Sequence, residues 1–267
     1  MDRPTMYDAV AITPDIAVLP SYFPIPTLGI IPVNAFVLKA AEPMLVDTGL
    51  VPLSDEFMAQ LSGVIDPPDL RWLWLTHCHQ DHLGSLQRIL DQAPQLRVVT
   101  TFLGIGIMSL FQPLPLDRVY LLNPGQSISL GDREITAVKP PSYDSPETVG
   151  FHDPKSNAFF CADCFGALML EPADSAAAIG AAKLQEGSTK WATVDAPWLH
   201  VVDRAAFGRS LDRVREMKPE LVLSSHLPVA RGMTEQLLGH LAAAPDAAPF
   251  VGPDQPALEA MLAGMRA

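Results

Sequence analysis

Short apolar runs that end in polar or glycine-containing turns recur along the chain, and they predict strands. Other segments repeat apolar residues every three or four positions, as amphipathic helices do; Leu211, Val214 and Met217 are one such set. The predicted strands are residues 9–19, 34–39, 43–47, 71–75, 98–100, 119–122, 127–130, 134–138, 148–151, 158–161 and 221–223. The predicted helices are residues 55–61, 85–90, 102–111, 173–185, 207–217, 235–241 and 257–265.

Two segments carry more specific expectations. Residues 102–111 are almost wholly apolar, which predicts a buried helix. Residues 20–29 contain Pro20, Pro24 and Pro26, so an irregular loop is expected there. Strands and helices alternate in both halves, and no linker or internal repeat is visible. We therefore expect a single α/β domain over residues 1–267.

Charge and cysteine content narrow the class of protein. The formal net charge is −12, which argues against nucleic acid or an anionic membrane as the main partner. The three cysteines, Cys78, Cys161 and Cys164, are too few for a disulfide framework and favour a reducing compartment. The N-terminus lacks a signal-peptide pattern, and no apolar run reaches the roughly 18 residues of a membrane span. These features predict a cytoplasmic protein.

The densest group of chemistry-bearing residues follows the strand at residues 71–75. Residues 76–84 read THCHQDHLG, and the ligand-type side chains among them are His77, His79, Asp81 and His82. A strand that ends in such a loop can aim several imidazoles at one point, and neutral imidazole is the commonest nitrogen ligand of metals. The loop therefore predicts one half of a metal site.

Four more polar residues stand just past the ends of apolar strands, in the same placement as this loop. They are Asp47, Asp144, Asp163 and His226. A carboxylate at Asp163 could bridge two cations, and Asp47 either supports a metal-bound imidazole or caps its own turn. Each signal is weak by itself because loop aspartates are common turn formers. Together they predict ligands gathered at strand ends.

Asp47-Thr48-Gly49, the HxHxDH segment from His77, Asp163 and His226 stand in an order that resembles the metallo-β-lactamase fold superfamily, over about residues 12–235. The resemblance implies a four-layer αββα sandwich with a dinuclear metal centre between the loop edges of two sheets. It implies that His77 and His79 bind the first metal, and that Asp81, His82 and His226 bind the second. It also implies that Asp163 bridges the metals and that Asp47 supports the ligands.

One position departs from that superfamily. A third histidine for the first metal usually stands about 20 residues before the bridging aspartate, where this chain has Asp144. His152 lies too near Asp163 for that role if a hairpin intervenes. Either Asp144 is the ligand, which we favour, or the first metal lacks one ligand. A third carboxylate would favour iron or manganese somewhat over zinc.

The chain is also similar to the diiron branch of the superfamily, the flavodiiron and oxygen-binding diiron proteins. The local cues are residues 65–70, Asp144-Ser145-Pro146 and residues 161–166. That branch typically has glutamate where this chain has His79. The length of 267 residues also leaves no room for an appended flavodoxin domain. Both departures weaken the redox hypothesis.

The leading expectation is therefore a metal-dependent hydrolase. Two divalent ions, zinc or iron with manganese as a third option, would share a hydroxide that attacks an ester, thioester, lactone, amide or phosphoester. Asp81 would orient the water. Tyr143 is either a donor to the oxyanion or, in the interpretation we prefer, a packed loop side chain. The alternative function is a non-haem diiron oxygen-binding or redox protein.

Loops over the metals decide the substrate in such a fold. The candidate loops are residues 20–33, 102–116 and 186–205, which are mainly apolar and carry few cationic groups. They predict a small neutral or partly apolar substrate. A homo-oligomer is compatible with the sequence, which leaves the oligomeric state open.

Overall fold

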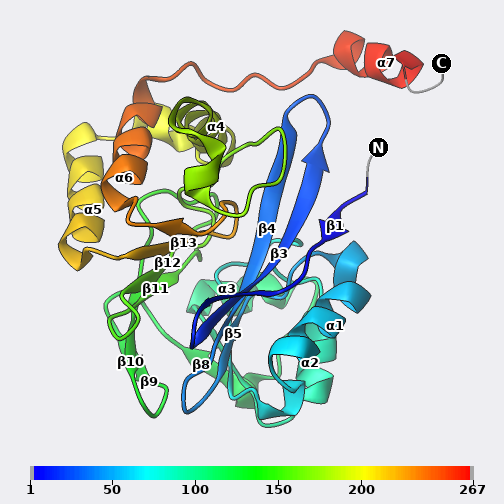
Figure 1. Cartoon of the computed structure of the whole chain (residues 1–267), viewed down its shortest axis with the longest axis vertical. Helices are drawn as coiled ribbons and strands as arrows, with labels where there is room; N and C mark the ends of the chain where they lie inside the picture. Colours follow the sequence, from blue (N-terminus) through cyan, green and yellow to red (C-terminus); the bar gives the residue numbers. More distant parts are fainter. Residues whose placement is uncertain (1–2, 265–267) are drawn as a thin grey trace.

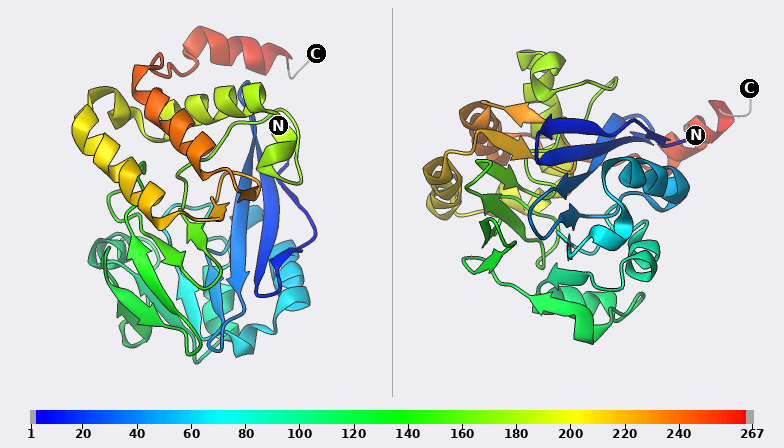
Figure 2. Two further views of the ribbon diagram at one scale, coloured as in Figure 1. Left: turned by 60° about the vertical axis from the view of Figure 1, so that its left-hand side comes forward. Right: turned by 60° about the horizontal axis from the view of Figure 1, so that its bottom comes forward.

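The computed structural model describes residues 3–264 and places two β-sheets face to face (Figure 1, Figure 2). The first sheet contains, in spatial order, β1 (Thr5–Met6), β3 (Ile16–Ile25), β4 (Gly29–Leu38), β5 (Met44–Val46), β6 (Trp72–Trp74), β7 (Arg97–Thr100) and β8 (Val119–Leu121), with β2 (Val10–Thr13) paired to β3. The second contains β14 (Ala230–Arg231), β13 (Leu221–Leu223), β12 (Ala158–Phe160), β11 (Gly150–Asp153), β10 (Glu134–Val138) and β9 (Ser127–Ser129).

Helices cover the outer faces of both sheets. On the first sheet these are α1 (Ser54–Val64) and α2 (Leu86–Gln92), with α3 (Phe102–Met108) at the periphery. On the second sheet they are α4 (Ala181–Asp195), α5 (Arg204–Met217) and α6 (Thr234–Ala243). Short 3-10 turns are η1 (Val51–Leu53), η2 (Pro67–Asp69), η3 (Leu116–Arg118), η4 (Ala176–Ile179), η5 (Pro197–Val201) and η6 (Ala244–Asp246). An extended stretch leads from η6 to α7 (Gln255–Gly264) (Figure 1).

Three apolar clusters hold these layers together. Between the sheets, Phe151 stacks on Phe160 at a ring distance of 4.3 Å, and Phe36 meets Phe160 edge-on at 5.5 Å. A second cluster joins the first sheet to α1 and α2, and a third joins the second sheet to α4, α5 and α6. Strands such as β5 and β6 are therefore buried on both faces, which explains their continuous apolar sequences. The result is the four-layer αββα sandwich expected from the sequence.

Strand direction brings the expected ligands to one edge of the sandwich. β5 and β6 are parallel neighbours, so the turn after β5 and the loop after β6 leave the sheet side by side. β12 and β13 are parallel neighbours in the second sheet, and Asp163 and His226 follow them. At this edge Asn34 donates hydrogen bonds to the carbonyls of Ser224 and Leu227, at 3.0 and 2.8 Å, and so ties β4 to the second sheet.

The prediction of an irregular loop at residues 20–29 is wrong. The chain continues as β3 to Ile25 and returns along β4, with unbroken register from the Ile16–Leu38 pair to the Ile25–Gly29 pair. Pro20 and Pro24 are four positions apart, so their nitrogens face the same side of the strand, and the loss of donors is confined to that side. Ten residue pairs of antiparallel sheet outweigh the local preference of proline for loops.

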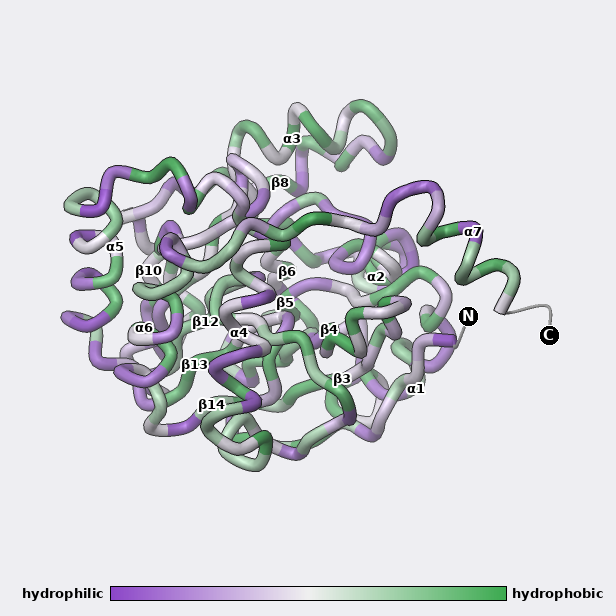
Figure 3. The backbone as a smooth tube through the Cα atoms, turned by 90° about the horizontal axis from the view of Figure 1, so that it is seen from above, coloured by the Kyte–Doolittle hydropathy of each residue, from purple (hydrophilic) through white to green (hydrophobic). Residues whose placement is uncertain are grey.

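Two helix predictions also fail in part. The expected buried helix at residues 102–111 is the shorter α3, and Figure 3 shows it as a largely hydrophobic segment on the periphery. Phe102 is 75% exposed and Leu110, just beyond the helix, is 83% exposed. The apolar residues of this run surround the helix axis, and within α3 only Gly104 and Met108 are buried.

The helix expected at residues 173–185 starts later and ends later. Gly180, with φ of +84°, separates η4 from α4, and α4 then continues to Asp195. Part of the expected substrate loop at residues 186–205 is therefore helix. The predicted C-terminal helix ran to Met265, which lies outside the described residues; α7 ends at Gly264. Among residues 3–264, no helix combines the length and the hydrophobicity needed to cross a membrane.

Candidate metal centre

All seven ligands expected from the sequence meet at one edge of the sandwich. Their side chains form overlapping groups in which one ligand atom from each residue lies within 4.8 Å of the others. These groups are His77, His79 and Asp144; His77, His82 and Asp163; and Asp81, His82 and His226. Overlap of this kind is expected of a site that holds two ions rather than one.

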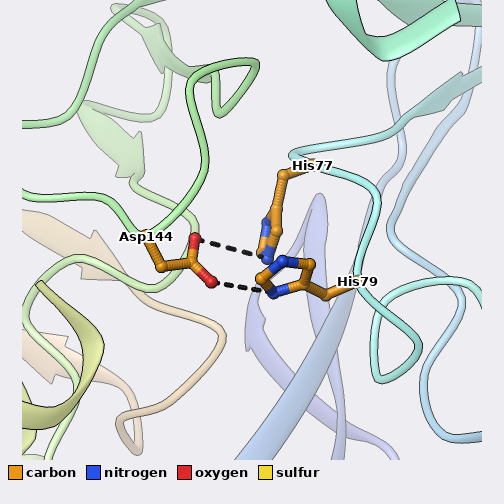
Figure 4. A group of neighbouring side chains, drawn as sticks. All are labelled: His77, His79 and Asp144. Carbon is orange, nitrogen blue, oxygen red and sulfur yellow. Dashed lines mark ion pairs between the residues drawn. The ribbon is translucent and has the colours of Figure 1, made fainter. Parts of the chain in front are cut away.

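The first half of the cluster is centred on Asp144 (Figure 4). Its Oδ2 lies 2.7 Å from His79 Nδ1, and its Oδ1 lies 3.8 Å from His77 Nε2. His152 is elsewhere, on β11, where it pairs with Phe159 of β12. The structure thus brings Asp144 to the place at which the sequence lacked a third histidine. Its role as a ligand stays a prediction.

The second half contains two buried imidazoles that face the same carboxylates. His82 Nε2 lies 3.5 Å from Asp81 Oδ2 and 3.3 Å from Asp163 Oδ1. His226 Nε2 lies 3.5 and 3.2 Å from the same two oxygens. Asp163 Oδ2 instead faces His77 Nε2, at 3.4 Å. One carboxylate therefore presents a different oxygen to each half, which is the geometry that a bridging ligand needs.

Hydrogen bonds on the far side of the rings orient both imidazoles of the second half. Asp47 Oδ2 lies 2.8 Å from His82 Nδ1, and the Asp47 carboxylate also accepts bonds from the backbone and the hydroxyl of Thr76. The carbonyl of Pro32 lies 2.8 Å from His226 Nδ1. Each ring is held with its other nitrogen toward Asp163. Asp47 thus contacts the His82 imidazole, which agrees with the interpretation that it supports a metal-binding histidine.

Several buried atoms in the cluster have no hydrogen-bond partner among the described residues. They are Nε2 of His77 and His82 and Oδ1 of Asp144 and Asp163. Leaving a buried polar group unpaired costs roughly 1–3 kcal/mol, so four such atoms at one point indicate a missing partner. Imidazole nitrogen and carboxylate oxygen suit zinc, iron and manganese, and the residues present therefore fit a pair of divalent ions.

The ionisation of the cluster also reflects its crowded charges. Burial would lower the pKa of His226, but Asp163 and Asp81 raise that pKa to about 9. Burial opposes a rise in the pKa of His82 as well, yet Asp81, Asp163 and Asp47 hold that pKa well above its ordinary value. Burial would raise the pKa of Asp163, but the three imidazoles around it hold that pKa far below its usual range. Negative charge therefore dominates the site and favours positive partners.

Sequence reasoning missed two residues that lie at this site. Asp195, at the end of α4, places a carboxylate oxygen within 4.8 Å of Asp144 and Asp163. Burial, then Asp163 and Asp144, raise the pKa of Asp195 well above its ordinary value. Trp191 donates its Nε1–H to the Asp163 carbonyl at 3.1 Å, and its ring lies 4.8 Å from that of His226. Trp191 and Asp195 are four positions apart, as on one face of a helix, and this spacing is the signal in the sequence; the expectation of a loop over residues 186–205 hides it.

Tyr143 is a packed loop side chain. Its ring centroid lies 5.1 Å from that of Trp198, and Lys139 Nζ lies over the ring, 3.7 Å from its centroid. Trp198 Nε1 donates to the Tyr143 carbonyl at 2.7 Å. Within the described chain, no recorded hydrogen bond joins the Tyr143 hydroxyl to the metal cluster. This arrangement fits the packing interpretation better than an oxyanion donor.

Known proteins with related sequences and folds are flavoproteins and flavodiiron proteins. The chain is 28% identical over 134 residues to diflavin flavoprotein A 1 of Synechocystis sp., covering 50% of this chain and 23% of that protein. It is 26% identical over 133 residues to a nitric oxide reductase of Moorella thermoacetica, covering 50% and 33%. The matched region thus spans at most a third of these relatives.

Solved structures share the fold over most of the chain. Rubredoxin oxygen:oxidoreductase from Desulfovibrio gigas matches with a TM-score of 0.75 at 18% identity, over 91% of this chain and 63% of that one. The flavodiiron protein from Giardia intestinalis matches with a TM-score of 0.75 at 14% identity, over 91% and 60%. The model of the family described as ODP family beta lactamase matches residues 31–226, which contain every residue of the cluster, and the chain belongs to this family.

Proposed function

We propose that this chain holds a pair of iron ions and reduces a small diatomic oxidant, dioxygen or nitric oxide, with electrons from a flavoprotein. The observation that carries the proposal is the cluster of imidazoles and carboxylates that shares Asp163 between two halves. The relatives whose names state an activity are a nitric oxide reductase and an oxygen:oxidoreductase. The alternative function from the sequence is therefore better supported than the leading one.

The ligand set answers one of the two objections to this function. The resemblance seen in the sequence implies that the diiron branch has glutamate at the position of His79 and histidine at the position of Asp144. In this chain an imidazole and a carboxylate have exchanged those places, and the two side chains lie 2.7 Å apart. Each ion would still receive two imidazoles, one terminal carboxylate and the bridging Asp163. The exchange leaves the formal charge of the site unchanged.

The residues of the chain would bind and shield the ions. His77, His79 and Asp144 would hold the first ion, and the second would be held by Asp81, His82 and His226. A bound iron pair supplies redox-active centres for electron transfer to the oxidant. Complete reduction of dioxygen to two waters consumes four electrons and four protons, and conversion of two nitric oxides to nitrous oxide and water consumes two of each.

Metal-dependent hydrolysis remains a second candidate because of one observation. His79 gives the loop the HxHxDH pattern, and its side chain is 49% exposed, so the first half of the cluster is open to solvent and to a larger substrate. No relative named above is a hydrolase, and the comparisons therefore favour the redox function.

The test begins with elemental analysis of the purified chain. We expect two irons per chain, and after anaerobic reduction we expect stoichiometric consumption of dioxygen or nitric oxide. Asp163→Asn should abolish both metal binding and consumption, whereas His152→Asn, outside the cluster, should retain them. Two zinc ions with ester or phosphoester hydrolysis, and no oxidant consumption by the iron-loaded chain, would overturn the proposal and support the hydrolase.

A further inference from the structure

Asp195 brings a fourth carboxylate to the metal cluster from a different layer of the fold. One oxygen from each of Asp144, Asp163 and Asp195 lies within 4.8 Å of the others. Metal–oxygen distances of roughly 2.0–2.2 Å place two oxygens of one ion at most about 4.4 Å apart, so small side-chain shifts would bring the three oxygens around one ion. Asp195 belongs neither to the histidine loop nor to a strand end, because it reaches the cluster on α4.

The position of Asp195 is unfavourable for an unpaired carboxylate. Two other carboxylates are close by, and the surroundings are largely buried. Asp195 is also the last residue of α4, where the helix dipole presents its negative end. All three conditions disfavour a negative charge, and a bound cation would offset all three at once.

The chain holds Asp195 in this position from both sides. Trp191 lies four residues earlier on the same face of α4, and its Nε1–H is bonded to the Asp163 carbonyl at 3.1 Å. Trp198, three residues later in η5, is bonded to the Tyr143 carbonyl at 2.7 Å, next to Asp144. The flanks of Asp195 are thus attached to the two segments that carry its neighbouring carboxylates.

Unpartnered atoms point to an ion at the same place. Oδ1 of Asp144 and Nε2 of His77 are buried without a hydrogen-bond partner among the described residues. The His77 and Asp163 side chains are almost completely buried. His77 Nε2 faces Oδ1 of Asp144 and Oδ2 of Asp163, the two carboxylates that Asp195 approaches.

We propose that Asp195 is a further ligand of the first ion. That ion would then have three carboxylates, from Asp144, Asp163 and Asp195, in addition to the imidazoles of His77 and His79. Five ligands with a majority of carboxylate oxygens favour iron or manganese over zinc, which prefers four. This inference rests on the proposed function, because it assumes the two-ion centre and names a residue that selects its metal.

The test compares Asp195→Asn with Glu186→Gln, which neutralises an exposed acid on the same helix. Each metal-free protein is titrated anaerobically with Fe²⁺, Mn²⁺ and Zn²⁺. In Asp195→Asn we expect one of the two iron equivalents to bind about 10–100-fold more weakly and the other to bind as in the wild type. The affinity for zinc should fall less than the affinity for iron. Glu186→Gln should bind like the wild type.

A thermal readout separates a ligand from a structural residue. Asp195→Asn should raise the unfolding temperature of the metal-free protein, since it removes charge repulsion, and lower that of the iron-loaded protein. The inference would be overturned if Asp195→Asn and the wild type bound each metal with equal affinity. It would also be overturned if the substitution shifted the unfolding temperature in the same direction in the metal-free and the iron-loaded protein. Two tightly bound irons in the wild type without consumption of dioxygen or nitric oxide would instead overturn the proposed function alone.

Discussion

The two halves of the metal cluster differ in how firmly their side chains are held. In the second half, the rings of His82 and His226 are buried, and each has its remote nitrogen bonded to a fixed partner, Asp47 or the Pro32 carbonyl. In the first half, His79 is half exposed, and its ring nitrogen contacts Asp144, itself a predicted ligand. The second half is pre-organised by the fold. In the first half His77 is also buried, with its Nδ1 3.2 Å from the Thr76 hydroxyl, so it is the exposed His79 that depends on the ion to order it.

This difference assigns separate tasks to the two halves. The closed half, around His82 and His226, is suited to retaining its ion. The open half, around His79 and Asp144, has one exposed imidazole, and it is where the proposed oxidant would approach. It is also the half in which this chain departs from the pattern that its resemblance to the diiron branch implies.

The largest effect is expected from the residue that both halves share. Asp163→Ala removes the oxygens that face His77 on one side and His82 and His226 on the other. Both ions should be lost, with metal content near zero by elemental analysis. A variant that keeps one full equivalent would show that the halves are independent and that Asp163 does not bridge them.

Asp47→Asn should break the closed half selectively. An amide cannot accept all the bonds that the Asp47 carboxylate receives from Thr76 and shares with His82. We expect one metal equivalent to weaken about 10–100-fold in an anaerobic titration, with the other unchanged. Equal weakening of both equivalents would contradict the separation of the two halves.

The exchange of ligands in the open half can be reversed. His79→Glu alone should weaken the first ion, because it places a second carboxylate next to Asp144. The double variant His79→Glu with Asp144→His restores one imidazole and one carboxylate and should recover most of the lost affinity. A double-variant loss that equals the sum of the two single losses would show that these positions are not coupled.

The pH dependence of the metal-free protein tests the closed half directly. The pKa of His226 is about 9 when folded, against about 6.5 when unfolded. Its protonation therefore stabilises the fold fully below pH 6.5, and this contribution is lost as the pH rises through 9. The unfolding temperature should fall over that range, and much less so in His226→Gln. If the unfolding temperature fell equally in the wild type and in His226→Gln, protonation of His226 would not be the cause of the pH dependence.

The smallest effect is expected outside both halves. Tyr143→Phe keeps the ring that packs on Trp198 and under Lys139 and removes only the hydroxyl. Stability should change by less than about 0.5 kcal/mol, and metal content and oxidant consumption should stay at wild-type levels. A large loss of activity with normal metal content would assign the hydroxyl a role in the reaction.

The amino-acid sequence by itself determined the histidine loop and the sandwich around it. His77, His79, Asp81 and His82 lie within one loop, so their proximity follows from chain connectivity alone. Asp163 and His226 were predictable because they follow apolar strands, and parallel neighbouring strands present their carboxyl ends at one edge. The local sequence pattern was sufficient to predict a ligand wherever that ligand follows the end of a strand.

Only the tertiary structure decided which remote groups complete the cluster. Asp144 and His152 were both near the required position in sequence, and the pairing of β11 with β12 keeps His152 away. Asp195 arrives on α4, positioned by Trp191 and Trp198 through contacts with the other segments of the site. Hydrophobic pattern does not encode such contacts, because they depend on how helices pack across a sheet. The histidine loop and the carboxylates at strand ends were therefore readable in the sequence, whereas Asp195, which arrives by helix packing, was not.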